Sequence, residues 1–251
     1  MLVKINKQVY YLTGMYKEKV LIASTDVDSN YELRLSNLFK ILQLVASNHV
    51  HSLGVGHEEL LAHNLLWVLI RMEVKIYKTP LLDEEILVTT HPGEQKSFIF
   101  PRYFQIYDKK GNLIINASSM WALIDRTTRK VVLKPADLVS IKGEERKEDM
   151  PLPEKVVGDA SSLVETRHLR YTDIDLNGHL NNTSYIEYII NTHDNDFYKS
   201  HRIKSIRINY DKEIRPTDVV DIYTNNSYPE IIKGRVGEIN NFTAEIEYEE
   251  R

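Results

Sequence analysis

Between residues 173 and 182 the chain reads DIDLNGHLNN, a run of polar side chains that could exchange protons and stabilise a negative charge. Asp175, Asn177 and His179 alternate with apolar residues just before a segment with helical periodicity. A helix N-terminus supplies free backbone N–H groups and the positive end of the helix dipole, which suit a developing oxyanion. An imidazole exchanges protons near neutral pH. The run indicates a hydrolytic site or, more simply, a polar helix cap.

Calcium binding is a second interpretation, because D-x-D-x-N-G at 173–178 matches the start of an EF-hand loop. That loop requires a glutamate at its twelfth position, which here is Ser184, and a helix before it, which the sequence lacks. The chain has no cysteine, which excludes disulfides, thiolate zinc sites and a cysteine nucleophile. We therefore expect no metal at this site.

A related polar run occurs earlier in the chain. Residues 25–30 read TDVDSN and residues 172–177 read TDIDLN, an offset of 147 residues. Each copy leads into a segment with apolar residues three and four apart, 35–50 and 182–191, which predicts two helices. Ser36 and Thr183 lie at equivalent positions near the helix starts and are expected to cap them. An internal duplication explains both matches.

The two copies diverge at the position of the histidine. Alignment places Glu32 opposite His179 and Tyr31 opposite Gly178. A purely structural cap gives no reason for this difference. We therefore expect one half to carry the chemistry and the other to be adapted to another task, such as holding substrate.

The rest of each half predicts the strands that must position these loops. Segments rich in β-branched and aromatic residues occur at 86–90, 98–107, 113–124 and 130–133, and again at 203–214, 219–224, 231–236 and 242–248. DKKGN at 108–112 predicts a hairpin turn. We expect an α+β protein with two long helices, each with a mostly antiparallel sheet, divided into residues 1–135, a charged linker at 136–162, and residues 163–251.

The composition of the chain narrows its class and its partners. With 42% hydrophobic and 27% charged residues among 251, it is typical of globular proteins. A net charge of −4 gives no basic excess, so nucleic acid is not expected as a partner. The N-terminus lacks the apolar core of a signal peptide, and no apolar run approaches the ~18 residues of a membrane span. These features predict a cytoplasmic protein.

Taken together, the motifs resemble the acyl-acyl carrier protein thioesterases of plants and bacteria, and the chain is identified as a bacterial member. The pattern D-x-D-x-N-x-H-x-N-N at 173–182 continues as TSYIEYI, and INYDKEI at 208–214 resembles the strand that supplies a third catalytic position. Glu213 follows His179 by 34 residues. ASNHV (46–50), NLLWVLIRMEV (64–74) and SSMWALIDRTTRK (118–130) resemble the N-terminal domain, so the resemblance spans nearly the whole chain.

This resemblance implies a tandem hotdog fold and hydrolysis of the thioester that joins a fatty acyl chain to acyl carrier protein, with no metal or organic cofactor. His179 and Glu213 would hold and deprotonate a water, Asn177 would position the water or the carbonyl, and Asp175 would orient its neighbours. Backbone N–H groups from about residue 179 to 182 would bind the oxyanion. Ile214 stands where plant members often have a cysteine.

Glu213 requires a change in strand geometry to reach this site. Alternation along its strand places it on the polar face with Arg207 and Asn209, where it would be an ordinary solvated side chain. A bulge near residues 211–212 would turn it towards His179.

The acyl chain needs an apolar tunnel, which we expect in the first half, although the same apolar stripe would suit an ordinary core. The expected lining residues are Leu38, Ile41, Leu42 and Val45, with Trp67 and Trp121 as walls. Acyl carrier protein is acidic and should dock on a locally basic surface. The candidate clusters are Arg126, Arg129 and Lys130; Arg167 and Arg170; or Lys199, Arg202 and Lys204.

Three other functions fit parts of the pattern. They are an acyl-CoA thioesterase, a non-catalytic hotdog module that binds acyl thioesters, and a hotdog dehydratase. Retention of Asp175, Asn177, His179 and Glu213 together argues against the binding module, and the match in both halves argues against the dehydratase. The two halves already form an internal pseudo-dimer, and pairing of two chains into a homodimer would suit such sheets.

Overall fold

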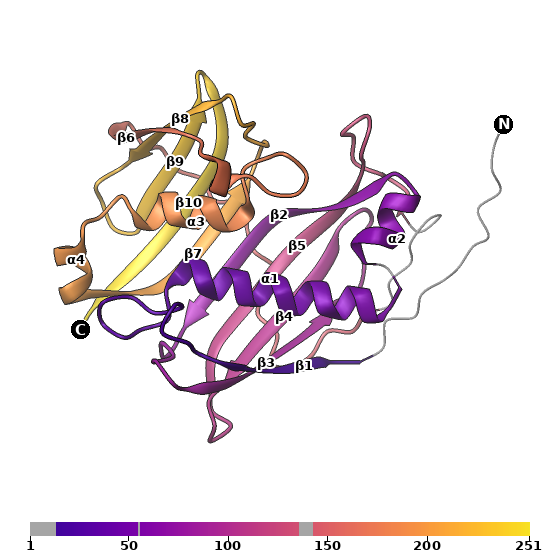
Figure 1. The fold of residues 1–251 in the computed structure, drawn as a ribbon, viewed down its shortest axis with the longest axis horizontal. Coiled ribbons are helices and arrows are strands. Elements are labelled where there is room, and N and C mark those ends of the chain that lie inside the picture. Colours follow the sequence, from indigo (N-terminus) through magenta and orange to yellow (C-terminus); the bar gives the residue numbers. More distant parts are fainter. Residues whose placement is uncertain (1–13, 55, 136–142) are drawn as a thin grey trace.

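The computed structural model describes residues 14–54, 56–135 and 143–251. These ranges contain four α-helices and ten strands, whose arrangement is drawn in Figure 1. The helices are α1 (Leu35–Ser52), α2 (His57–Ala62), α3 (Asn182–Ile190) and α4 (Asn195–Ser200). The strands are β1 (Tyr16–Leu21), β2 (Leu65–Ile76), β3 (Glu85–Pro92), β4 (Phe100–Tyr107), β5 (Leu113–Asp125), β6 (Ser162–His168), β7 (His201–Tyr210), β8 (Val219–Thr224), β9 (Glu230–Val236) and β10 (Ile239–Glu250).

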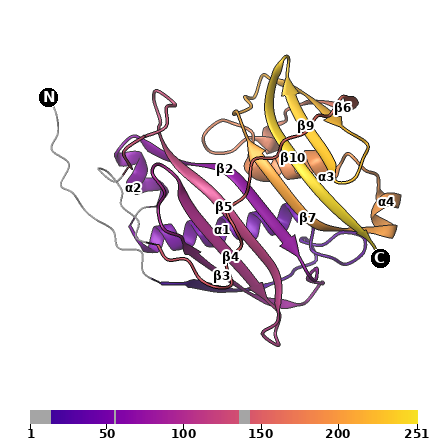
Figure 2. The ribbon, with the colours of Figure 1, turned by 180° about the vertical axis from the view of Figure 1, so that it is seen from behind.

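All ten strands form one antiparallel sheet, which Figure 2 shows from behind. From its two edges inward the sheet repeats one plan, β1-β3-β4-β5-β2 in the first half and β6-β8-β9-β10-β7 in the second. Strands β2 and β7 meet at the centre, where Arg71 pairs with Asn209 and Lys75 with Ser205. The duplication inferred from the two polar runs is therefore present in the strand order as well.

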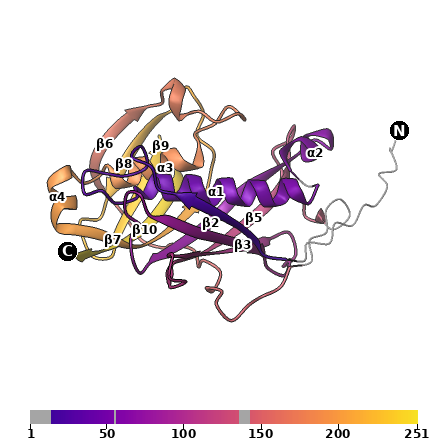
Figure 3. The same ribbon diagram turned by 60° about the horizontal axis from the view of Figure 1, so that its bottom comes forward.

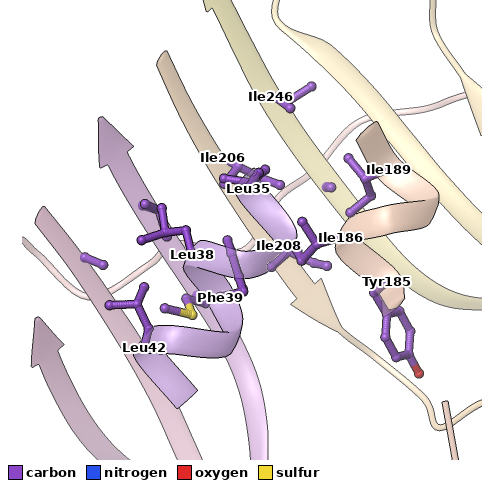
Figure 4. Close-up of a cluster of buried hydrophobic side chains, with 14 of the residues drawn as sticks. Leu35, Leu38, Phe39, Leu42, Tyr185, Ile186, Ile189, Ile206, Ile208 and Ile246 are labelled. Atoms are coloured by element: carbon purple, nitrogen blue, oxygen red, sulfur yellow. The ribbon is translucent and has the colours of Figure 1, made fainter. Parts of the chain in front are cut away.

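Helices α1 and α3 lie against the same face of this sheet and contact each other (Figure 3). Buried side chains recur every three or four residues along α1, including Leu38, Leu42 and Val45. Ile186 and Ile189 of α3 are fully buried in the same core. Figure 4 shows these helices packing onto strands β7 and β10. One core thus extends across both halves and fixes the loops that precede the two helices.

The helix expected at 35–50 is present and extends to Ser52, whereas the second helix has nine residues, half the length of α1. The capping predictions are wrong, because an N-cap lies before the first helical residue and both predicted caps lie inside the first turn. Asn181 caps α3 by accepting from the Thr183 N–H at 2.9 Å. Helix α1 follows Arg34 and has no side-chain cap.

The strand predictions hold in outline, but one predicted strand is absent and three observed strands were not predicted. Residues 130–133 form only an isolated bridge between Val131 and Ile124. Strands β1, β2 and β6 were not expected, and β6 begins inside the predicted linker. Of that linker, residues 136–142 lie outside the described ranges and residues 143–161 contain no helix or strand. No helix in the described ranges is long and apolar enough to cross a membrane.

Candidate active site

The loop before α3 is shaped by Asp175. Its Oδ1 accepts from the backbone N–H of Asn177 at 2.8 Å and from that of His179 at 3.1 Å. The Asp175 N–H in turn donates to the His179 carbonyl at 2.8 Å. Gly178 takes the left-handed conformation, with φ +80°, where a side chain would be strained. Asp175 therefore fixes the backbone that carries Asn177 and His179, and the Asn177 side chain lies 3.4 Å from its second oxygen.

Glu213 reaches this loop because β7 ends in a bulge. The backbone N–H groups of Asp211 and Lys212 both donate to the Asn241 carbonyl, at 2.9 and 3.0 Å, which is the two-to-one pairing of a bulge. Beyond it, the Ile214 carbonyl accepts from the Leu180 N–H at 2.9 Å and ties the segment to the loop. The bulge expected at 211–212 is thus present.

The imidazole of His179 and the carboxylate of Glu213 meet at the resulting site. Nε2 of His179 lies 3.4 Å from Oε2 of Glu213, with side-chain exposures of 20% and 42%. A partly buried imidazole beside a half-exposed carboxylate can hold a water and exchange a proton with it. The structure therefore brings together Asp175, Asn177, His179 and Glu213, all four residues proposed from the sequence.

A fifth residue, Arg129, enters the site from the first half. Its Nε donates to Oε2 of Glu213 at 3.2 Å, and its Nη2 contacts Oε1. The sequence had placed Arg129 among candidate docking cations. No local pattern reveals its actual partner, because the two residues lie in different halves and meet only through the fold.

Burial is the main influence on the imidazole. It lowers the pKa of His179 below its usual value of 6.5, and the nearby charge of Arg129 lowers it further. The carboxylate of Asp175 and the backbone of Asn177 raise this pKa and the charge of Arg215 lowers it, but the net shift stays downward. His179 is therefore neutral at physiological pH and able to accept a proton.

Backbone donors for an oxyanion are fewer than expected. The N–H groups of His179, Leu180 and Asn181 already donate within the chain, to Asp175, Ile214 and Asp173 respectively. That of Asn182, the first residue of α3, has no acceptor among the described residues. The helix N-terminus thus offers one free donor at this position rather than four.

The apolar residues expected to hold an acyl chain do not line a single pocket. Leu42 and Trp121 line a narrow apolar pocket that ends at the first turn of α3. The other lining residues of this pocket are Phe39, Gln43, Leu69, Met72, Phe104, Asn182 and Thr183. Leu38 lines a different pocket between the halves, Val45 is fully buried in the core, and Trp67 packs edge-on against Phe100 at 4.8 Å. Of these expected residues, Leu42 and Trp121 line a pocket that reaches Asn182, the residue at which the candidate loop joins α3.

The equivalent loop before α1 has the same backbone with different side chains. Asp28 accepts from the N–H groups of Asn30 and Glu32 at 2.8 and 3.1 Å. Glu32, in the position of His179, forms a bidentate ion pair with Arg251 at 2.7 and 2.8 Å. Its carboxylate therefore joins the loop to the end of the chain and is not free to exchange protons with a ligand.

The loop carboxylates of the candidate site are likewise engaged by the chain itself. Oδ2 of Asp173 accepts from the Arg170 N–H at 2.8 Å and from the Tyr188 hydroxyl at 3.2 Å. Within the described ranges, no group of three or more His, Cys, Asp or Glu side chains could hold a metal ion. The EF-hand interpretation therefore has no support in the loop geometry.

Comparison with known families covers both halves of the chain. A model of the acyl-ACP thioesterase N-terminal domain matches residues 13–141, and a model of the acyl-ACP thioesterase C-terminal domain matches residues 158–249. An oleoyl-acyl carrier protein thioesterase from Arabidopsis thaliana is 25% identical over 91% of this chain and 67% of its own length. A palmitoyl-acyl carrier protein thioesterase from Gossypium hirsutum is 23% identical over 84% of this chain and 54% of its own length. The chain thus spans about half to two thirds of these chloroplastic relatives.

Solved structures share the fold along almost the whole chain. An acyl-ACP thioesterase from Bacteroides thetaiotaomicron is 25% identical, with a TM-score of 0.80 over 94% of this chain and 98% of that one. A 12:0-ACP thioesterase from Umbellularia californica is 20% identical, with a TM-score of 0.81 over 96% of this chain and 99% of that one. The arrangement of both halves is therefore common to bacterial and plant proteins.

Proposed function

Because the chain belongs to the acyl-ACP thioesterase family, we propose that it hydrolyses the thioester between a fatty acyl chain and acyl carrier protein, releasing a free fatty acid. The observation that carries this proposal is the contact between His179 Nε2 and Glu213 Oε2, at 3.4 Å, beside the N-terminus of α3. It places a neutral imidazole and a carboxylate where a water and a thioester carbonyl could meet a backbone donor.

The reaction needs only groups of this chain and a water. His179 and Glu213 hold the water and take its proton while its oxygen bonds to the thioester carbonyl carbon. Asn177 positions the water or the carbonyl, and the Asn182 N–H donates to the oxyanion. Collapse of the tetrahedral intermediate breaks the carbon–sulfur bond, and the departing thiolate receives the proton, so that a fatty acid and a thiol are formed.

The acyl chain would occupy the narrow pocket beside Leu42 and Trp121, which begins at the first turn of α3. This pocket lies between α1 and strands of the first half, in keeping with a tandem hotdog whose first half, residues 1–135, holds the chain and whose second, 163–251, carries the chemistry. The pocket is narrow, so the chain would enter by displacing side chains that line it.

The carrier protein would dock on exposed cations next to the site. Arg126 and Lys130 flank Arg129, are exposed, and form no ion pair with any described residue. Of the other candidates, Arg167, Lys199, Arg202 and Lys204 each pair with a carboxylate, whereas Arg170 is exposed and forms no ion pair with a described residue. We favour Arg126 and Lys130 as contacts for an acidic partner, because they also lie on the same turn as Arg129, which contacts Glu213. A cytoplasmic location and a homodimer stay predictions from the sequence.

Hydrolysis of matched esters tests this function directly. Purified protein would be given a panel of fatty acyl esters of acyl carrier protein and of coenzyme A, with chain lengths varied, and thiol release measured. We expect turnover of at least one carrier-protein ester, with a higher kcat/KM than on the matched CoA ester. Turnover of CoA esters alone would contradict the carrier-protein assignment, and absence of turnover on every ester would overturn the proposed activity.

A further inference from the structure

Arg129 contacts the carboxylate of the candidate active site directly. Its guanidinium engages both oxygens of Glu213, with Nε at 3.2 Å from Oε2 and Nη2 against Oε1. His179 approaches the same Oε2 at 3.4 Å. One carboxylate oxygen is thus shared by the imidazole and the guanidinium, and the other is held by the guanidinium alone.

The turn that carries Arg129 is built to hold it there. Asp125 accepts from the Thr128 N–H at 2.7 Å and from the Thr128 hydroxyl at 2.9 Å, and the Asn64 amide donates to its other oxygen at 3.0 Å. The Arg129 N–H donates to the Asp125 carbonyl at 2.8 Å. Arg129 itself has φ +57°, a conformation that costs a non-glycine residue about 1 kcal/mol. A side chain on such an ordered turn is preorganised for its partner.

We propose that Arg129 is a positioning residue of the active site, which holds the Glu213 carboxylate facing His179 and so leaves His179 as the group that takes the proton from water. This inference rests on the proposed hydrolysis, in which His179 and Glu213 together take the proton from water. It assigns that proton to His179 and leaves Glu213 as its charged partner. A carboxylate forked by a guanidinium is a poor base, because protonation would break two charge-assisted hydrogen bonds. The same carboxylate is well placed to stabilise the imidazolium that forms when His179 accepts the proton.

The charge of Arg129 supports this division in a second way. It adds to burial in lowering the pKa of His179, which keeps the imidazole neutral before reaction. Removal of the Arg129 charge would raise the pKa of His179. Removal of its contacts with Glu213 would also leave that carboxylate unpaired beside the imidazole, which would raise the pKa further. Both consequences move the pH dependence of turnover in one direction.

The other half of the chain provides a matched arginine. Arg251 follows β10 as Arg129 follows β5, and these two strands hold equivalent places in the sheet. Its guanidinium likewise forks a carboxylate of the opposite half, that of Glu32. Replacement of Arg251 therefore removes a similar ion pair between the halves without touching the catalytic loop.

The test compares Arg129→Gln, Arg129→Lys and Arg251→Gln with wild type, using the best carrier-protein ester. We expect Arg129→Gln to lower kcat by about 10- to 100-fold, as a misplaced catalytic group does, with little change in KM. The acid limb of its kcat profile should move to higher pH. Arg129→Lys should restore part of the rate, and Arg251→Gln should keep the wild-type rate and profile. Thermal unfolding would show that each variant is folded at the assay temperature.

The outcomes separate this inference from the proposed activity. Wild-type turnover with an unchanged rate and pH profile in Arg129→Gln would overturn the role of Arg129 and leave hydrolysis standing. Equal losses in Arg129→Gln and Arg251→Gln, with no shift of the acid limb, would also overturn it, since both ion pairs would then act through stability alone. Absence of turnover by wild type would instead overturn the proposed function.

Discussion

The loops that precede α1 and α3 make the same hydrogen bonds at positions 147 residues apart. Asp28 and Asp175 each accept from two backbone N–H groups, and the residue three positions further, Tyr31 or Gly178, has positive φ. The bulge after β2 repeats that after β7, since two successive N–H groups donate to one carbonyl in each. The backbone of the site is therefore a property of the fold and occurs twice.

The side chains that differ between these loops identify the chemistry. Glu32 replaces His179, and Thr79 occupies the place of Glu213, one residue before the carbonyl that receives the loop N–H. Asp28 matches Asp175 and keeps its hydrogen bonds. The aspartate that both loops share therefore does not distinguish them, whereas the histidine and the distant glutamate occur together in one copy only.

The largest expected effect comes from exchanging the residue that distinguishes the loops. His179→Gln should lower kcat by about 10²- to 10⁴-fold, because it removes the proton acceptor. The matched Glu32→Gln should leave kcat within about twofold, since no reacting group lies at that loop, although it weakens the ion pair with Arg251. Steady-state hydrolysis of one ester by both variants measures the contrast, and equal losses would show that both loops take part.

The pH dependence of turnover should follow the titration of His179 and should not depend on the loop that contains Glu32. Burial and Arg129 lower the pKa of His179 below 6.5, and the neutral imidazole is the active form. Turnover should therefore be lost on acidification at a pH below 6.5. The kcat/KM profiles of wild type and Glu32→Gln should coincide, because Glu32 lies in the other loop. A wild-type acid limb at or above pH 6.5 would contradict the assignment of His179 as the base.

The two shared aspartates should behave alike in stability and differently in activity. Asp28→Ala and Asp175→Ala each remove a carboxylate that accepts two backbone N–H groups, and each should lower the free energy of unfolding by about 1–2 kcal/mol. Only Asp175→Ala should also lower turnover, by disordering Asn177 and His179. Urea unfolding and steady-state kinetics on the same preparations would show whether the effects separate in this way.

The smallest expected effect is on the free energy of unfolding and comes from substitutions at Gly178 and Tyr31, which have positive φ in the two loops. Gly178→Ala should lower the free energy of unfolding by about 1 kcal/mol, because an added Cβ meets no neighbouring atom and only the backbone is strained. Tyr31→Gly, at φ +62° in the other copy, should change it by less than about 1 kcal/mol, since relief of strain is offset by the greater freedom of glycine when unfolded. A larger loss in Tyr31→Gly would mean that its exposed ring packs more than its position suggests.

Local patterns in the sequence predicted much of this site. Helical periodicity located α1 and the start of α3, and the paired polar runs located both loops. Alternation along β7 showed that Glu213 needed a bulge, which is present. These features depend on a few neighbouring residues and can therefore be derived from them.

Features that depend on contacts between residues far apart in the chain were not predicted from the sequence. Strand β2 was missed because its two parts have different patterns. Residues 65–70 are a continuous apolar run beside β5 alone, whereas residues 71–75, which pair with both β5 and β7, alternate between polar and apolar side chains. Arg129 could not be assigned to Glu213, because 84 residues separate them and only the joined sheet brings them together. The roles of Leu38, Val45 and Trp67 also depend on which side of the core each one faces.

A structure of the protein with an acyl carrier protein whose thioester is replaced by a non-hydrolysable amide would test the central claim most directly. We expect the amide carbonyl to lie beside His179, with its oxygen about 3 Å from the Asn182 N–H, and the alkyl chain to lie against Leu42 and Trp121. A carbonyl bound instead at the loop of Glu32, with the second loop empty, would contradict it.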